Sequence, residues 1–90
     1  MEKKVLYAAE DCGDVTIIAV VSENSFGTKK LQKKLRNILY DLLCVGELDK
    51  DTPCDKQLVD DFENLVEEVS NGRNYEWEVY YFQYEEVPSL

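Results

Sequence analysis

Two stretches of this sequence carry apolar residues at the spacing of an α-helix, and each is bracketed by start and stop signals. Such stripes constrain the fold most, because each one must be buried against another element. The first stripe consists of Leu31, Leu35, Ile38, Leu39, Leu42 and Leu43. Thr28 suits the N-cap position, and Gly46 can end a helix in the left-handed conformation. We therefore predict a helix over residues 28–45.

The second stripe has stronger boundary signals. Its apolar members are Cys54, Leu58, Phe62, Leu65, Val66 and Val69. Thr52 is a candidate N-cap, and Pro53 fits the first helical position, where its missing N–H costs no hydrogen bond. The pair Asn71-Gly72 stops the pattern. These signals predict a helix over residues 53–70.

β-Branched and aromatic residues flank a short polar connection near the N-terminus. We predict a hairpin with strands near residues 4–10 and 14–22, joined by a turn in which Gly13 supplies a positive φ. The run Val15–Val21 is apolar at nearly every position. A strand with one solvated face alternates apolar and polar residues, so this run favours a strand covered on both faces rather than an exposed edge.

Six of the ten aromatic residues lie between Tyr75 and Tyr84. The segment alternates with period two and has high β-propensity, so we predict a single strand that ends at Pro88. One face of this strand would carry Tyr75, Trp77, Val79 and Tyr81. The other face would carry Glu76, Glu78, Tyr80, Phe82 and Tyr84. Two helices cover only one face of a small sheet, so rings on the other face are exposed or buried by another chain; alternatively, the rings complete the core.

The predicted order of elements is β-β-α-α-β within ninety residues. We predict an α+β fold, a two-layer sandwich in which two antiparallel helices cover one face of a three-stranded, largely antiparallel sheet. No repeat, low-complexity tract or linker interrupts the chain, which predicts a single domain over residues 1–90.

Cysteine usage and hydropathy indicate the compartment. The three cysteines are an odd number without C-x-x-C spacing, which favours free thiols in a reducing environment. Cys44 and Cys54 lie on or beside apolar stripes and are expected in the core, whereas Cys12 lies in the turn and is expected to be exposed. The sequence shows no apolar run long enough for a membrane span or a signal peptide. We therefore expect a soluble, cytoplasmic protein.

Negative charge is concentrated in the second half of the chain. The net charge is −9, to which residues 1–46 contribute +1 and residues 47–90 contribute −10. In the second predicted helix, Asp60, Glu63 and Glu67 lie opposite the apolar stripe. Along the helix axis, these carboxylates are separated by about one turn each, a distance comparable to the spacing of backbone phosphates in nucleic acid. This spacing favours a surface that binds a basic partner. The alternative is an ordinary solvated helix face.

Positive charge gathers at the start of the first predicted helix, in Lys29, Lys30, Lys33, Lys34 and Arg36. Lysines in a first turn oppose the helix dipole, and three explanations for them stay open. They pair with the acidic second helix, they bind a protein partner, or they bind a phosphate-like anion. The net charge of −9 repels polyanions and argues against direct binding of nucleic acid.

The residue types that most enzyme sites need are missing or scattered. There is no histidine, no glycine-rich phosphate loop and no cysteine pair with zinc-ligand spacing. The segment Asp49–Asp51 with Asp55 faintly resembles a calcium loop, but Cys54 stands where glycine is required and Pro53 breaks the geometry. We expect no metal, no cofactor and no enzymatic activity.

The acidic β-β-α-α-β outline, a second strand that reads Val-Thr-Ile-Ile and an aromatic, acidic final segment at Tyr75–Glu86 resemble one group of proteins. These are the small accessory proteins of bacteriophages and mobile elements of Gram-positive bacteria. Some small acidic phage proteins are anti-CRISPR or other anti-defence inhibitors that occlude a nucleic-acid channel. The resemblance implies action in the cytoplasm of a host cell, and it assigns no functional residue.

The sequence thus predicts a non-enzymatic protein-binding module, an inhibitor whose acidic residues meet a basic surface of a host defence or nucleic-acid enzyme and whose exposed rings supply an apolar anchor. The predicted contact residues are Asp60, Glu63, Glu67, Glu68, Glu76, Glu78, Trp77, Tyr80, Tyr81, Phe82 and Tyr84. Two alternatives stay open. One is a homo-oligomeric structural domain, such as a homodimer, that buries the aromatic strand by strand pairing or sheet stacking. The other is a small-anion or nucleotide binder that uses Lys29, Lys30, Lys33, Lys34 and Arg36.

Overall fold

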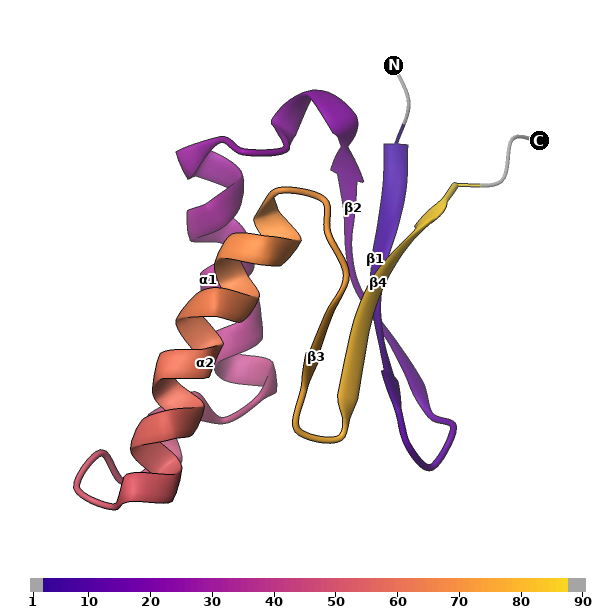
Figure 1. Cartoon of the computed structure of the whole chain (residues 1–90). Coiled ribbons are helices and arrows are strands. Elements are labelled where there is room, and N and C mark those ends of the chain that lie inside the picture. The colour runs from indigo at the N-terminus through magenta and orange to yellow at the C-terminus, as the bar shows by residue number, and fades with distance from the viewer. Residues whose placement is uncertain (1–2, 88–90) are drawn as a thin grey trace.

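A computed structural model describes residues 3–87 as two layers, a four-stranded sheet and a pair of helices on one of its faces (Figure 1). The strands are β1 (Lys3–Glu10), β2 (Val15–Ser22), β3 (Tyr75–Trp77) and β4 (Tyr80–Glu86). The helices are α1 (Lys29–Leu42) and α2 (Pro53–Ser70), with short 3-10 turns at Glu23–Ser25 and Val45–Glu47. The strands lie in the order β2-β1-β4-β3, and every neighbouring pair is antiparallel. The predicted α+β class is confirmed.

The number of strands is the main correction to the predicted fold. The segment predicted as one strand forms two, because the chain turns back at Glu78 and Val79. Glu78 adopts a left-handed conformation with φ of 55°. Non-glycine residues seldom do so, and no glycine, proline or asparagine marks the turn in the sequence.

The turn also changes which aromatic residues share a face. Because β3 folds back on β4, Tyr75 pairs with Phe82 and Trp77 pairs with Tyr80. All four rings therefore lie on the side of the sheet that the helices cover, whereas an unbroken strand would have divided them between two faces.

The first helix is shorter than predicted. Thr28 is its N-cap, as expected, and accepts a hydrogen bond of 3.2 Å from the backbone N–H of Leu31. The helix ends at Leu42, three residues before the predicted boundary. Cys44 adopts the left-handed conformation, with φ of 53°, that the sequence had assigned to Gly46.

The bounds of the second helix are confirmed. Pro53 occupies the first turn, and Gly72 has the positive φ, 84°, that suits the chain after a helix end. Thr52 is the N-cap residue, as predicted, although its hydroxyl makes no capping bond to the helix. It donates instead to the carbonyl oxygen of Asp49 at 3.0 Å.

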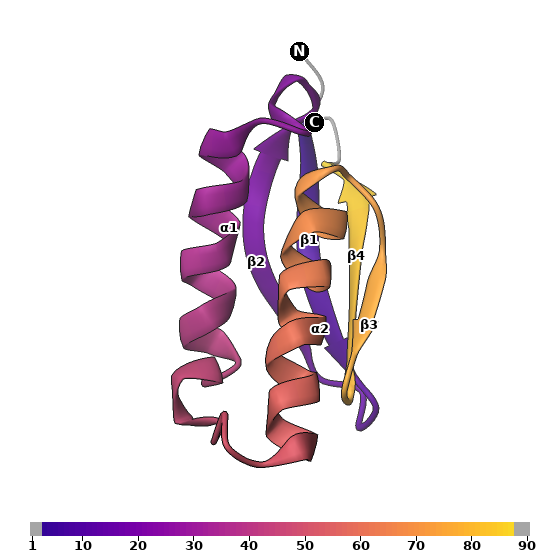
Figure 2. The same cartoon turned by 60° about the vertical axis from the view of Figure 1, so that its left-hand side comes forward.

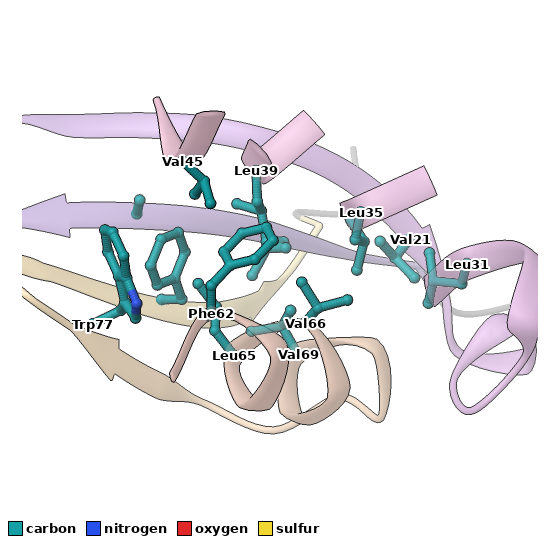
Figure 3. Packing of buried hydrophobic residues seen from close by; sticks show 13 residues of the cluster. Val21, Leu31, Leu35, Leu39, Val45, Phe62, Leu65, Val66, Val69 and Trp77 are labelled. Atoms are coloured by element: carbon teal, nitrogen blue, oxygen red, sulfur yellow. The ribbon is translucent and has the colours of Figure 1, made fainter. Parts of the chain in front are cut away.

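The two helices run antiparallel side by side, with α1 nearer β2 and α2 nearer β3 and β4 (Figure 2). One hydrophobic cluster fills the space between the layers (Figure 3). Its buried members are Leu6, Ala8, Val21, Leu31, Leu35, Leu39, Val45, Phe62, Leu65, Val66, Val69, Trp77 and Phe82. The indole N–H of Trp77 donates to the carbonyl oxygen of Leu58 at 3.3 Å, which satisfies its one polar atom inside the cluster.

The cysteines are placed differently from the sequence prediction. All three are free and exposed, so the expectation that Cys44 and Cys54 are core residues is wrong, and that for Cys12 is confirmed. Val45 enters the cluster next to Cys44. Pro88, the predicted end of the last strand, lies outside the described residues.

Candidate functional site

The face of the sheet opposite the helices carries a group of exposed apolar side chains. Along β1, Leu6 and Ala8 point toward the helices and are buried, so the alternate residues Val5 and Tyr7 point the other way. We call this surface the open face and define it by the residues Val5, Tyr7, Val15, Ile17, Val20 and Tyr81. Val15, Ile17, Val20 and Tyr81 are 60%, 70%, 52% and 42% exposed.

The prediction that the second strand is covered on both faces is wrong. β2 pairs only with β1 and forms an edge of the sheet. Its register shifts between Ile17 and Ala19, where Ile18 is an extra, bulged residue. Ile17 pairs with Tyr7 and Val20 pairs with Val5, so the bulge places both of these side chains on the open face.

Apart from Tyr81, the residues of the open face are not among the contact residues that the sequence predicted. A run such as Val15–Val21, in which Thr16 is the single polar residue, looks the same in a buried strand and in an edge strand with an exposed apolar face. Because two helices cover only one face of the sheet, the sequence did predict an exposed face, but it assigned the aromatic residues of the last segment to that face instead of the apolar residues of β2.

A groove of about 450 Å³ lies on the open face between Val5, Tyr7, Val15 and Ile17 and the carboxylates of Glu85 and Glu86. The hydroxyl of Tyr7 donates to Oε1 of Glu85 at 3.0 Å. Burial, followed by this bond, raises the pKa of Tyr7. The groove therefore combines apolar walls with acidic groups.

Most of the predicted aromatic anchor belongs to the core. Trp77 is 5% exposed and Phe82 is fully buried, which removes both from any contact surface. Tyr80 and Tyr84 are half-buried on the helix side, and the Tyr84 hydroxyl donates to the carbonyl oxygen of Val69 at 2.6 Å. Burial raises the pKa of Tyr84 well above its usual range.

One predicted ring and one predicted acid meet on the open face. Tyr81 is exposed there, and Glu76 is its partner across the β3–β4 ladder. Glu78 is exposed in the adjoining turn. This turn lies beside the β1–β2 turn, because the backbone N–H of Asp11 donates to the carbonyl oxygen of Val79 at 3.3 Å.

The predicted acids of the second helix lie on the helical layer, away from the open face. Asp60, Glu63 and Glu67 are exposed on α2. Glu63 forms an ion pair with Arg36 of α1, and Glu68 accepts a hydrogen bond of 3.0 Å from Arg73. The structure therefore divides the predicted contact residues between two surfaces.

The basic residues of α1 also divide into two groups. Lys29, Lys33 and Arg36 line a groove of about 410 Å³ next to α2, together with Gln32 and Val66. The ion pair to Glu63 confirms pairing with the second helix for Arg36 alone, and the bond raises the pKa of its guanidinium. Within residues 3–87, no salt bridge involves the four lysines. An acid beside Arg36 disfavours an anion in this groove.

One group of side chains has the geometry to hold a metal ion. Ligand atoms of Glu10, Cys12 and Asp14 lie within 4.8 Å of one another at the β1–β2 turn. The thiol of Cys12 lies 3.7 Å from a carboxylate oxygen of Glu10 and 3.6 Å from one of Asp14. Hydrogen bonds within the turn account for this arrangement.

Comparisons with protein-family models, with curated proteins and with solved structures found no match. Neither helix of the described chain is long and apolar enough to cross a membrane.

Proposed function

We propose that the chain is a non-enzymatic protein-binding module and that the open face is its contact surface. One observation carries this proposal: on the side of the sheet without helices, apolar side chains of β1 and β2 lie next to one another, and Tyr81 of β4 extends this apolar surface. Exposed apolar patches of this kind mark sites of protein–protein contact in soluble proteins. The aromatic ring of Tyr81 is suited to be an anchor there.

The charges around the open face favour a partner with basic groups around an apolar centre. Glu85 and Glu86 border the groove, and Glu76 lies beside Tyr81. A chain with net charge −9 also attracts a basic partner at long range. A host defence or nucleic-acid enzyme has such a surface where it binds its nucleic acid, and we propose inhibition by occlusion of that surface.

A capture experiment with matched variants tests this proposal. The immobilised chain is exposed to a cell lysate at low salt, and bound proteins are eluted with a salt gradient and identified by mass spectrometry. The open-face variant Tyr81→Arg should lose the bound protein. The control Asp60→Arg changes the charge on α2 by +2, against +1 for Tyr81→Arg, and should retain the bound protein.

A second step tests occlusion. The captured protein is purified, and its affinity for nucleic acid is measured with and without the wild-type chain. Competition by the wild type but not by Tyr81→Arg would support inhibition. The proposal fails if Tyr81→Arg and Asp60→Arg retain the same proteins, or if nucleic acid and the chain bind the captured protein together.

A further inference from the structure

The free edge of β2 lacks most of the features that prevent strands from pairing between molecules. It extends over eight residues, Val15–Ser22, with no charged residue and no proline. Natural edge strands are commonly short, charged or covered. The edge does contain one protective feature, the bulge at Ile18, which divides it into two segments.

Because of the distribution of charge, little electrostatic repulsion opposes the binding of a second copy of this chain at that edge. The elements nearest to it, β1, β2 and α1, belong to residues 1–46, whose net charge is +1. Of the −10 of residues 47–90, α2, β3 and β4 carry −8. Two copies that meet at their β2 edges would therefore keep their acidic halves apart.

The two ends of the β2 edge carry opposite charges. At the Val20–Ser22 end, Lys30 and Lys34 line a groove of about 160 Å³ between the strand and α1. The acid next to that end, Glu23, is neutralised by Lys4 at 3.3 Å. At the other end, Asp14 precedes the strand.

The charges along α1, the helix beside this edge, follow the same order as those at the two ends of β2. α1 runs back along β2 in the opposite direction (Figures 1 and 2). Lys30, Lys34, Ile38 and Asp41 follow one another at helical spacing and so share one side of α1. Arg36, on another side, pairs with α2. This side of α1 is therefore basic at the end near the lysine-lined groove and acidic at the other end, where Asp41 lies.

We propose that two copies of this chain pair antiparallel through their β2 edges and form a continuous eight-stranded sheet around a two-fold axis. Antiparallel pairing puts Lys30 and Lys34 of one copy next to Asp14 and Asp41 of the other, twice by symmetry. The ladder consists of the two segments on either side of the bulge at Ile18. The open faces of the two copies then lie on the same side of the joined sheet.

This dimer does not depend on the function proposed for the open face, and the two fail independently. Tyr81→Arg changes the open face on β4, an inner strand, and should leave the dimer intact while it abolishes partner capture. Substitutions of Lys34 or Asp41 on α1 should weaken the dimer and leave partner capture intact.

Sedimentation equilibrium of the purified chain and its charge variants tests the proposal. The wild type should dimerise in the micromolar range. Lys34→Glu and Asp41→Lys should each weaken the dimer about tenfold or more, because each places like charges together at two symmetric contacts. The double variant Lys34→Glu/Asp41→Lys should restore it. Lys33→Glu has the same charge change on the α2 side of α1 and should leave the dimer unchanged.

A wild type that stays monomeric up to hundreds of micromolar would overturn the proposal. Equal losses for Lys33→Glu and Lys34→Glu, or no recovery in the double variant, would also overturn it. Loss of the dimer in Tyr81→Arg would show that sheet faces, not β2 edges, hold two copies together.

Discussion

The two edges of the sheet differ in length, charge and cover. β2 has eight residues without a charged side chain, whereas β3 has three residues with Glu76 at their centre and Glu78 in the following turn. α2 packs against β3 and buries Trp77. A short, charged and covered edge resists pairing with other chains, so the β3 edge is well protected, whereas the β2 edge has only the bulge at Ile18.

We infer from this difference that stability and interaction depend on opposite sides of the molecule. The β3 side is held by polar contacts as well as apolar ones, since Tyr75 donates to Asp61 at 2.8 Å and Trp77 donates to Leu58 at 3.3 Å. The β2 side exposes Val15, Ile17 and Val20. We therefore expect substitutions on the β3 side to lower the free energy of unfolding. Substitutions on the β2 side should instead weaken the association of the chain with other molecules.

The largest expected effect comes from Trp77→Ala. This substitution leaves a cavity beneath α2 and should lower the free energy of unfolding by about 3–5 kcal/mol. Ile17→Ala on the exposed side of β2 should cost less than about 1 kcal/mol. Urea denaturation measures both. Equal losses would mean that the β2 side stabilises the fold as much as the β3 side does.

The two hairpin turns should respond in opposite directions. Gly13 has φ of 97° and open space around its Cα, so Gly13→Ala should cost about 1 kcal/mol through backbone strain alone. Glu78→Gly removes such strain at φ of 55° and should gain up to about 1 kcal/mol. Thermal unfolding compares the two variants. A destabilised Glu78→Gly would show that the Glu78 side chain itself holds the β3–β4 turn.

Removal of a single tyrosine hydroxyl should also lower the free energy of unfolding more on the β3 side than on the open face. Tyr75→Phe removes the bond to Asp61 next to β3 and should cost about 1 kcal/mol. Tyr7→Phe removes the bond to Glu85 on the open face, where water replaces the hydroxyl, and should cost less. If Tyr7→Phe is the more damaging change in urea denaturation, the open face contributes more to folding than we infer.

The smallest expected effect is a dependence of stability on alkaline pH. Burial, then the bond to Asp61, raises the pKa of Tyr75 from its ordinary value of 10 to about 12. Because the folded state holds this proton more tightly, the contribution of Tyr75 is complete below pH 10 and is lost as the pH rises toward 12. Urea midpoints measured from pH 9 to 11.5 should fall less steeply for Tyr75→Phe. The same slope in both proteins would contradict this assignment.

Local signals in the sequence predicted the helices and the first hairpin well. The apolar stripes and the residues Thr28, Pro53 and Gly72 act within a few positions of the chain, so periodicity and capping rules apply to them directly. The turn at Glu78 escaped prediction because a charged residue holds a backbone conformation that is usually reserved for glycine or asparagine.

The candidate site was harder to predict because it depends on the order of the strands. Val15–Val21 is apolar whether β2 lies at the centre or at the edge, and only its pairing with β1 alone exposes it. Trp77 and Phe82 became core residues because the extra turn placed them on the helix side. Both outcomes follow from contacts between distant segments, which composition and spacing do not encode.

Amide hydrogen exchange at several protein concentrations tests most directly whether the β2 edge is the associating side. We expect exchange of the outward N–H groups of Val15–Ser22 to slow as the concentration rises, while that of Tyr75–Trp77 stays constant. Exchange at β2 that is independent of concentration, or protection that appears at β3 instead, would contradict the account.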